Sequence, residues 1–171
     1  LLRLRYASPH PRHLGMSAIR AHEELPALVR HVHLPVQSGS DAVLKRMIRR
    51  YTIDEYHERV AALRQRVPEV TLSTDVIVGF PGETREDFQA TLALVREVGF
   101  VGLFGFKYSV RPFTPAQKLV DDVSEEEKSA RLAELFELSE SFRRRHLASL
   151  VGSAVDVLCT GPGKNGFTGR T

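Results

Sequence analysis

Short apolar runs alternate with longer segments of helical periodicity along most of the chain. Residues 2–6, 31–37, 71–80 and 101–109 are rich in Leu, Val, Ile and aromatic side chains, and Pro, Gly or Ser residues follow or end them, which is typical of buried strands. The segments between them repeat apolar residues every three to four positions, which indicates helices. This alternation predicts an α/β fold of βα units, with parallel strands and outer helices.

Capping signals indicate where three of the helices begin. Thr52 and Ser124 each precede a glutamate by three positions, which is the pattern of a capping box. Thr84 follows a Pro-Gly-Glu turn and also precedes an apolar helical stripe. We therefore expect helices after these three residues, the last reaching about residue 150. A further helix is expected between residues 17 and 29, interrupted by Pro26.

The pattern changes after Gly152. Residues 153–171 alternate apolar and polar positions around a Gly-Pro-Gly break, which is typical of antiparallel strands. We therefore predict two domains, with the α/β unit at residues 1–150 and the start of a small β module at residues 151–171. Because the first residue is Leu1 and lies close to a predicted strand, we expect the chain to be part of a longer protein.

The composition, 42% hydrophobic and 26% charged, is that of a soluble globular protein. No apolar run has the roughly 18 residues of a membrane-spanning helix, and no signal peptide is present, so we expect a cytoplasmic protein without membrane association. The net charge of +3 suits an anionic partner but does not require one. The single cysteine, Cys159, excludes an internal disulfide and a multi-cysteine metal site within this chain.

Polar side chains gather at the carboxyl ends of the predicted strands, where βα sheets bind their ligands. Gln37 ends the second run, Ser73 and Asp75 share one face of the third, and Lys107 and Ser109 share one face of the fourth. A single such residue is more often a hydrogen-bonded structural group. Because several such residues occur at corresponding strand ends, a binding site and a structural role are equally good interpretations of them.

Three other features each have two interpretations. Residues 79–84 join a strand to a helix amino terminus, which favours anions, although Pro-Gly turns there are also common structural devices. His31 and His33 face the same side of a strand, but no third metal ligand is evident, so a structural or solvated role is favoured. The run Arg143-Arg144-Arg145 is either a solvated helix face or a phosphate-contacting patch.

Three segments, in this order and spacing, resemble the radical S-adenosylmethionine (SAM) methylthiotransferases, most closely the tRNA 2-methylthioadenosine synthases. They are HVHLPVQSGSDAVLKRMIRRYT, LSTDVIVGFPGETREDF and FGFKYSVRPFTPA. The resemblance implies the second half of a partial (βα)6 barrel, followed by the first strands of a TRAM domain, a small RNA-binding β-barrel. It also implies SAM and two 4Fe-4S clusters as cofactors. The cluster cysteines lie outside this chain, and Cys159 matches none of them.

The same resemblance assigns roles to individual residues. It places Gln37 and the adjacent Ser38 near SAM and pairs Arg49 with the methionine carboxylate. It also implies that Asp75 binds the ribose hydroxyls. These roles suit the chemistry, since a guanidinium forks onto a carboxylate and a carboxylate accepts from two hydroxyls. Arg50 is the alternative to Arg49, because the family usually has Asn-Arg-Gly where this chain has Ile-Arg-Arg.

The expected substrate side comprises Tyr108 and Arg111, with the arginine run at 143–145 as an RNA contact. The family's Arg-Pro-Gly-Thr-Pro reads Arg-Pro-Phe-Thr-Pro at residues 111–115, which alters a loop on this side. The implied activity adds a methylthio group to C2 of N6-isopentenyladenosine beside the tRNA anticodon. The chain alone, without the cluster domain, is expected to be inactive.

Implied partners are tRNA and a sulfur donor or iron-sulfur assembly proteins, and the protein is expected to be a monomer. One alternative is a related methylthiotransferase that acts on threonylcarbamoyladenosine in tRNA or on a ribosomal protein. Another is an RNA-binding module without catalysis.

Overall fold

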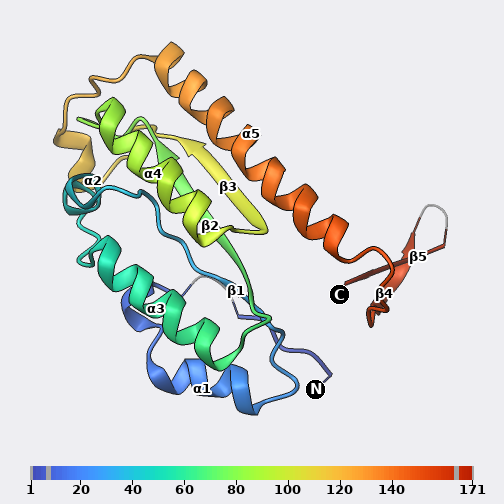
Figure 1. Cartoon of the computed structure of the whole chain (residues 1–171). Helices are drawn as coiled ribbons and strands as arrows, with labels where there is room; N and C mark the ends of the chain where they lie inside the picture. Colours follow the sequence, from blue (N-terminus) through green and yellow to red (C-terminus); the bar gives the residue numbers. More distant parts are fainter. Residues whose placement is uncertain (1, 7–8, 164–165, 171) are drawn as a thin grey trace.

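Three parallel strands form the central sheet of the protein. The computed structural model describes residues 2–6, 9–163 and 166–170. In the sheet, β1 (His31–His33), β2 (Thr71–Val78) and β3 (Gly102–Lys107) lie side by side in that order (Figure 1). A separate antiparallel hairpin, β4 (Leu158–Gly163) and β5 (Gly166–Arg170), follows at the carboxyl end. The parallel α/β sheet and the change to antiparallel pairing are confirmed.

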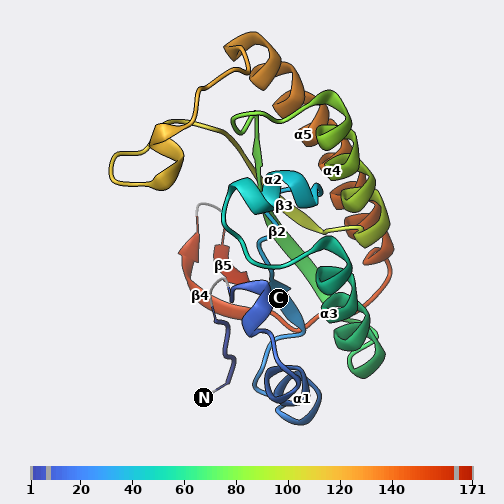
Figure 2. The same cartoon turned by 90° about the vertical axis from the view of Figure 1, so that its left-hand side faces the viewer.

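The helices gather on one side of the sheet, as Figure 2 shows for α3, α4 and α5. Their bounds are α1 (Met16–Glu24), α2 (Asp41–Arg46), α3 (Ile53–Arg66), α4 (Arg85–Val98) and α5 (Glu125–Ser149), with short 3-10 turns η1 (Pro11–His13) and η2 (Pro115–Lys118). Among the described residues, no helix combines the length and apolar character needed to cross a bilayer. No helix of the described residues covers the opposite face of the sheet, so Phe104 and Phe106 of β3 are more than half exposed.

The core lies between the sheet and these helices. The apolar stripe of α4, which includes Phe88 and Leu92, is fully buried together with Leu72 and Val76 of β2. Each such side chain contributes about 1.5–3 kcal/mol when it leaves water. The core therefore fixes the sheet from its helical side and leaves the other side free to form a site.

All three helices begin where they were predicted to begin, and the capping box is confirmed at Thr52 but only half formed at Ser124. Thr52 before α3 and Thr84 before α4 each form a complete capping box. Ser124 accepts a hydrogen bond from the Glu127 amide, but the Glu127 carboxylate does not return to the cap. It pairs with Arg131 at 2.8 Å, and this ion pair replaces the second half of the box.

Residues 2–6 were predicted as a strand, and that prediction was wrong. A single parallel bridge joins Leu4 to Leu28, in which the Leu4 amide donates to the carbonyl of Ala27 at 2.7 Å. Leu2 and Leu4 are 81% and 42% exposed, so the segment presents no buried face that would hold a longer ladder. The first predicted helix ends at Glu24, before the interruption expected at Pro26, because proline disfavours helical backbone in the residue before it.

The strand predicted at residues 31–37 is interrupted after His33. Pro35 has no amide hydrogen to donate, and the amide of Val36 donates to the side-chain hydroxyl of Thr74 at 3.0 Å. Pairing resumes at Gln37, whose amide donates to the carbonyl of Asp75 at 2.8 Å. The interrupted ladder therefore still fixes Gln37 beside β2. The runs at 71–80 and 101–109 likewise form shorter strands, β2 and β3.

A buried ion pair joins the β2–α4 loop to α5. Glu83 accepts hydrogen bonds from the Gly79 amide at 2.6 Å and from the Arg131 guanidinium at 2.7 Å. Both side chains are almost fully buried, at 1% and 6% exposure. Burial raises the pKa of the Glu83 carboxyl, while the Gly79 amide and Arg131 oppose that rise.

We expect Glu83→Gln to lower the free energy of unfolding by about 3 kcal/mol, because it leaves a buried guanidinium short of its counter-charge. The effect falls at the low end of the usual range because Glu127 still contacts Arg131. Urea unfolding measures it. The matched control is Glu134→Gln, which breaks the exposed pair with Arg85 and should cost less than about 1 kcal/mol. Equal losses in the two variants would contradict a special role for the buried pair.

Candidate functional site

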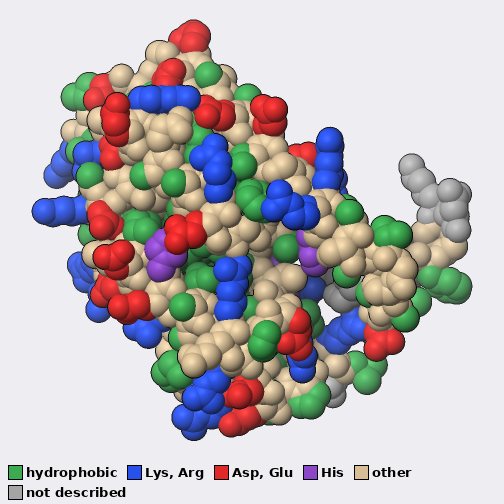
Figure 3. Space-filling model, viewed as in Figure 1, with side chains coloured by type: hydrophobic (Ala, Val, Ile, Leu, Met, Phe, Trp, Pro, Cys, Tyr) green, Lys and Arg blue, Asp and Glu red, His purple; other side chains and the backbone are tan. Residues whose placement is uncertain are grey.

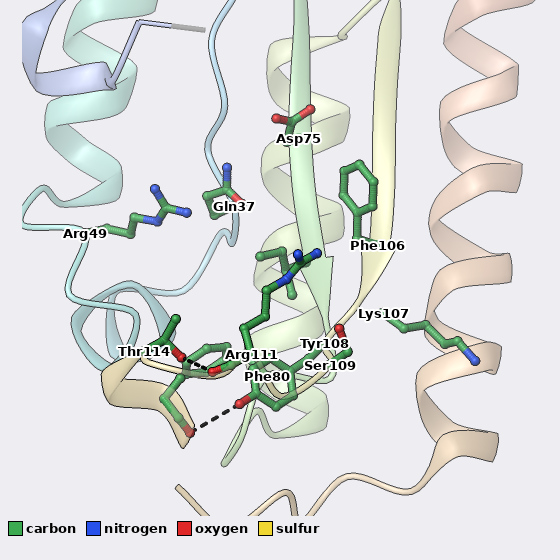
Figure 4. A pocket seen from close by; sticks show the side chains of 12 residues that line it. Gln37, Arg49, Asp75, Phe80, Phe106, Lys107, Tyr108, Ser109, Arg111 and Thr114 are labelled. Carbon is green, nitrogen blue, oxygen red and sulfur yellow. Dashed lines mark hydrogen bonds between the residues drawn. The ribbon is translucent and has the colours of Figure 1, made fainter. Parts of the chain in front are cut away.

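A cavity of about 430 Å³ opens at the carboxyl end of the sheet, on the side that the helices leave free (Figure 4). It lies where βα sheets bind ligands. Its lining comes from the segment that follows β1, from the loop after α2, from β2 and β3 with the loops that follow them, and from η2. The lining residues are Gln37, Arg49, Asp75, Ile77, Phe80, Phe106, Lys107, Tyr108, Ser109, Arg111, Thr114 and Ala116.

Gln37 has a left-handed backbone, with φ of 72°. Its amide and carbonyl both pair with β2, through Asp75 at 2.8 Å and Ile77 at 2.9 Å. The side chain is 8% exposed and lines the cavity. The turn thus ends the interrupted strand and fixes the amide side chain at the cavity wall.

Arg49, and not Arg50, lines this cavity. Figure 4 shows its guanidinium directed toward Gln37, with Asp75 on the neighbouring strand. Ile48 and Arg50 on either side both adopt left-handed backbone, at φ of 59° and 56°. These two turns place successive side chains in different directions, and Arg50 lines other clefts. Of the two arginines that the sequence offered, Arg49 is therefore the one in the cavity wall.

A chain of hydrogen bonds runs along the open face of the sheet as far as His33, which lies beside Asp75. His31 contacts the hydroxyls of Thr71 at 2.8 Å and Ser73 at 2.9 Å. His33 contacts Ser73 at 2.9 Å through Nδ1 and lies 3.3 Å from the Asp75 carboxylate through Nε2. Burial lowers the pKa of His31 to about 4, so this ring is neutral at pH 7. The two histidines therefore support the orientation of Asp75, and no group of three metal-ligating residues occurs among the described residues.

The structure places Ser38 outside the cavity. Its side chain is fully buried, 3.4 Å from the hydroxyl of Thr91 on α4, and it accepts from the amide of Ser40 at 3.2 Å. The left-handed turn at Gln37 directs the next residues toward α4. There a Cβ on Gly39 would lie 2.5 Å from the Thr91 Cα, so only glycine fits. Ser38 and Gly39 thus have structural positions under the site.

Two of the residues expected on the substrate side line the cavity. Tyr108 is 8% exposed, packs edge-on against Phe80 with ring centroids 5.0 Å apart, and donates its hydroxyl to the carbonyl of Ala116 at 3.2 Å. Arg111 is exposed at the rim (Figure 4). Lys107 lines the cavity only with its stem, because its ammonium bonds Glu125 of α5 at 2.9 Å.

The arginine run of α5 is not brought to the cavity. At 1.5 Å per residue, it lies about 27 Å along the helix from Glu125, which contacts the cavity residue Lys107. Arg143 and Arg144 both pair with Glu140, at 2.7 and 2.9 Å, and Arg145 lies over the ring of Phe142. Figure 1 places this end of the helix toward the β4–β5 hairpin, and in Figure 3 basic and acidic side chains intermingle over this view of the molecule.

The sequence comparisons decide the family. The model of the radical SAM superfamily matches residues 3–95, more than half of the chain. The chain belongs to the radical SAM superfamily.

Individual relatives give a narrower likeness. The chain is 66% identical over 164 residues to a tRNA-2-methylthio-N(6)-dimethylallyladenosine synthase of Sorangium cellulosum, which covers 96% of this chain and 33% of that protein. It is 47% identical over 159 residues to the synthase of the same name from Anaplasma marginale, covering 93% of this chain and 35% of the relative. The chain thus spans about a third of the length of the curated relatives it matches.

The structural comparison supports the radical SAM fold. Coproporphyrinogen III oxidase (HemN) from Escherichia coli, described as a radical SAM enzyme, matches with a TM-score of 0.65 and 18% identity, over 94% of this chain and 39% of that one. The expected fold class, part of a radical SAM barrel, is confirmed.

Some features of this cavity were not predicted from the sequence. The hydrogen-bonded chain of His31, Ser73 and His33 beside Asp75 was not predicted, although a structural or solvated role was favoured for the two histidines. Phe80 and Phe106 line the cavity although neither was singled out. For Phe106 a signal was available, because Phe104, Phe106 and Tyr108 alternate with Gly105 and Lys107 along the strand.

We expect Arg50→Gly to raise the free energy of unfolding by about 0.5–1 kcal/mol. A left-handed backbone costs a residue with a Cβ about 1–2 kcal/mol, and the entropy that glycine loses on folding offsets part of the gain. Chemical denaturation measures the change. Arg59→Gly inside α3 is the matched control and should lower stability by about 1 kcal/mol. A loss of stability in both variants would show that the Arg50 side chain makes a contact that outweighs the strain.

Proposed function

We propose that this chain is the later half of the SAM-binding barrel of a tRNA methylthiotransferase that modifies C2 of N6-isopentenyladenosine next to the anticodon. The observation that carries the proposal is one cavity in which Gln37, Arg49 and Asp75 meet, in a superfamily defined by its use of SAM. The identity to relatives named as tRNA-2-methylthio-N(6)-dimethylallyladenosine synthases supports the choice of reaction.

The residues of the cavity fit SAM. The Arg49 guanidinium would pair with the methionine carboxylate, and the Asp75 carboxylate would accept hydrogen bonds from the ribose hydroxyls. Gln37 would donate or accept at the cavity wall, since its amide can do both. His33, 3.3 Å from Asp75, would keep that carboxylate oriented. The cavity volume is also within the range of small-molecule sites.

When SAM and its 4Fe-4S cluster are bound, they supply the radical that activates an otherwise unreactive C–H bond. The residues of this chain bind and orient SAM and shape the wall that faces the substrate. We assign the cysteines of two clusters to other parts of the protein, because Cys159 is exposed on the β4–β5 hairpin.

For the substrate, we assign tRNA to the rim of the cavity at Tyr108 and Arg111. We further propose that residues 151–171 begin a TRAM domain and that the nearby arginine run at 143–145 extends the RNA surface toward it. The protein would act as a cytoplasmic monomer and would receive sulfur from a donor or an iron-sulfur assembly protein.

In the full-length protein, Arg49→Ala and Asp75→Ala should each weaken SAM binding by about 1.5–3 kcal/mol, the scale of a hydrogen bond to a charged group. Isothermal titration with SAM measures this. Arg50→Ala is the matched control, because this neighbouring arginine lies outside the cavity, and its SAM affinity should equal that of the parent. If Asp75→Ala and Arg49→Ala also matched the parent, the cavity would not be the SAM site.

The arginine run makes a separate prediction. Replacing Arg143, Arg144 and Arg145 with Ala should lower the salt slope of tRNA binding by about 1.8, which is two net charges at 0.9 each, because Glu140 already neutralises one of the three. Measuring affinity between low and moderate salt gives the slope. Glu140→Gln should increase the salt slope, because it removes the carboxylate that neutralises one of the arginines. An unchanged slope in both variants would identify the run as a solvated helix face.

A further inference from the structure

The loop between β3 and η2 presents a fully exposed phenylalanine. The side chain of Phe113 is 102% exposed, so no part of the described chain covers its ring. Its backbone is left-handed, with φ of 63°, a conformation that glycine adopts without strain and that L side chains rarely adopt. Exposure of an aromatic ring to water and backbone strain are both unfavourable. Neither is offset by a side-chain contact of Phe113 in the described residues.

The strained conformation is nevertheless held in place. The Phe113 amide donates to the side-chain oxygen of Gln117 at 3.2 Å, and the Thr114 hydroxyl donates to the carbonyl of Arg111 at 2.9 Å. On the other side of the loop, the Tyr108 hydroxyl donates to the carbonyl of Ala116 at 3.2 Å. The ring is therefore presented by a loop with fixed internal contacts.

The surroundings of the ring are cationic and adjoin the cavity. Arg111 and Thr114, on either side of Phe113, both line the cavity. Arg111 and Lys118 are exposed, and in the part of the chain that the structure describes neither makes an ion pair. The next carboxylates along the sequence are engaged elsewhere, since Asp121 contacts Lys128 and Asp122 accepts from the Gly82 amide.

We propose that Phe113 is a stacking platform for an RNA nucleobase that lies next to the base entering the cavity. A nucleobase offers a flat π face to the ring, and its phosphates suit two unpaired cations. This inference rests on the proposed function, because it assumes that the substrate of the cavity is RNA. The alternative is a partner protein, which would need a larger apolar surface. The exposed Val110 and Val120 of the same segment would extend the apolar surface around Phe113.

The test uses the full-length enzyme and an anticodon stem-loop RNA with 2-aminopurine beside the target adenosine. Stacking on Phe113 should quench the fluorescence of this base. Phe113→Leu keeps apolar area but removes the π face, so it should abolish the quenching and weaken RNA binding roughly five- to 150-fold, the range of a base–aromatic stack. Phe113→Tyr keeps the ring and should retain both.

Folding is checked with Phe113→Gly, which relieves the backbone strain and should raise the melting temperature while it weakens RNA binding as Leu does. If Phe113→Leu binds and quenches like the parent, the stacking inference is overturned, and an apolar protein contact becomes the explanation of the exposed ring. If the parent binds and modifies the RNA while Phe113→Leu behaves like the parent, only the stacking inference is overturned and the proposed function stands. A parent that binds no RNA would overturn the proposed function together with it.

Discussion

One buried carboxylate holds the carboxyl end of the sheet against α5. Glu83 binds the Gly79 amide at the end of β2 and the Arg131 guanidinium on α5, so the strand, the loop and the helix share one oxygen. The loop fits closely around this contact, since a Cβ on Gly79 would lie 2.3 Å from the Lys128 stem. The Lys128 ammonium in turn lies 5.6 Å from the centroid of the Tyr108 ring, which lines the cavity. The cavity wall therefore depends on an ion pair that contributes no group to the cavity itself.

The helices cover only one face of the sheet, which explains why the cavity is lined by both polar and aromatic side chains. The core packs between the sheet and the helices, so the opposite face is free to carry polar and aromatic side chains. His31, Ser73 and His33 form a hydrogen-bonded chain there, and His33 lies 3.3 Å from the Asp75 carboxylate. The Phe104 ring packs edge-on against His33, with ring centroids 5.8 Å apart. Polar groups on a partly buried face must be satisfied, and this chain satisfies them while it orients the carboxylate.

Backbone strain is concentrated around the cavity. Four non-glycine residues among the described ones have left-handed backbone: Gln37, Ile48, Arg50 and Phe113. Gln37 lines the cavity, Ile48 and Arg50 flank the lining residue Arg49, and Phe113 lies between the lining residues Arg111 and Thr114. Such conformations persist only where surrounding contacts impose them, and they are frequent at binding sites. Here they turn successive side chains toward or away from the same cavity.

The sequence by itself determined the parallel α/β architecture, the starts of α3, α4 and α5, and the polar residues at the strand ends. These features depend on periodicity and cap chemistry within a few neighbouring residues, so they can be read from local pattern. The tertiary structure alone decided that Arg49 rather than Arg50 lines the cavity, that Ser38 packs against α4, and that the arginine run lies far along α5. It also decided that residues 2–6 make only one bridge. Each of these outcomes depends on a local change of backbone direction or on a partner distant in the sequence, and neither is encoded in the spacing of apolar and polar residues.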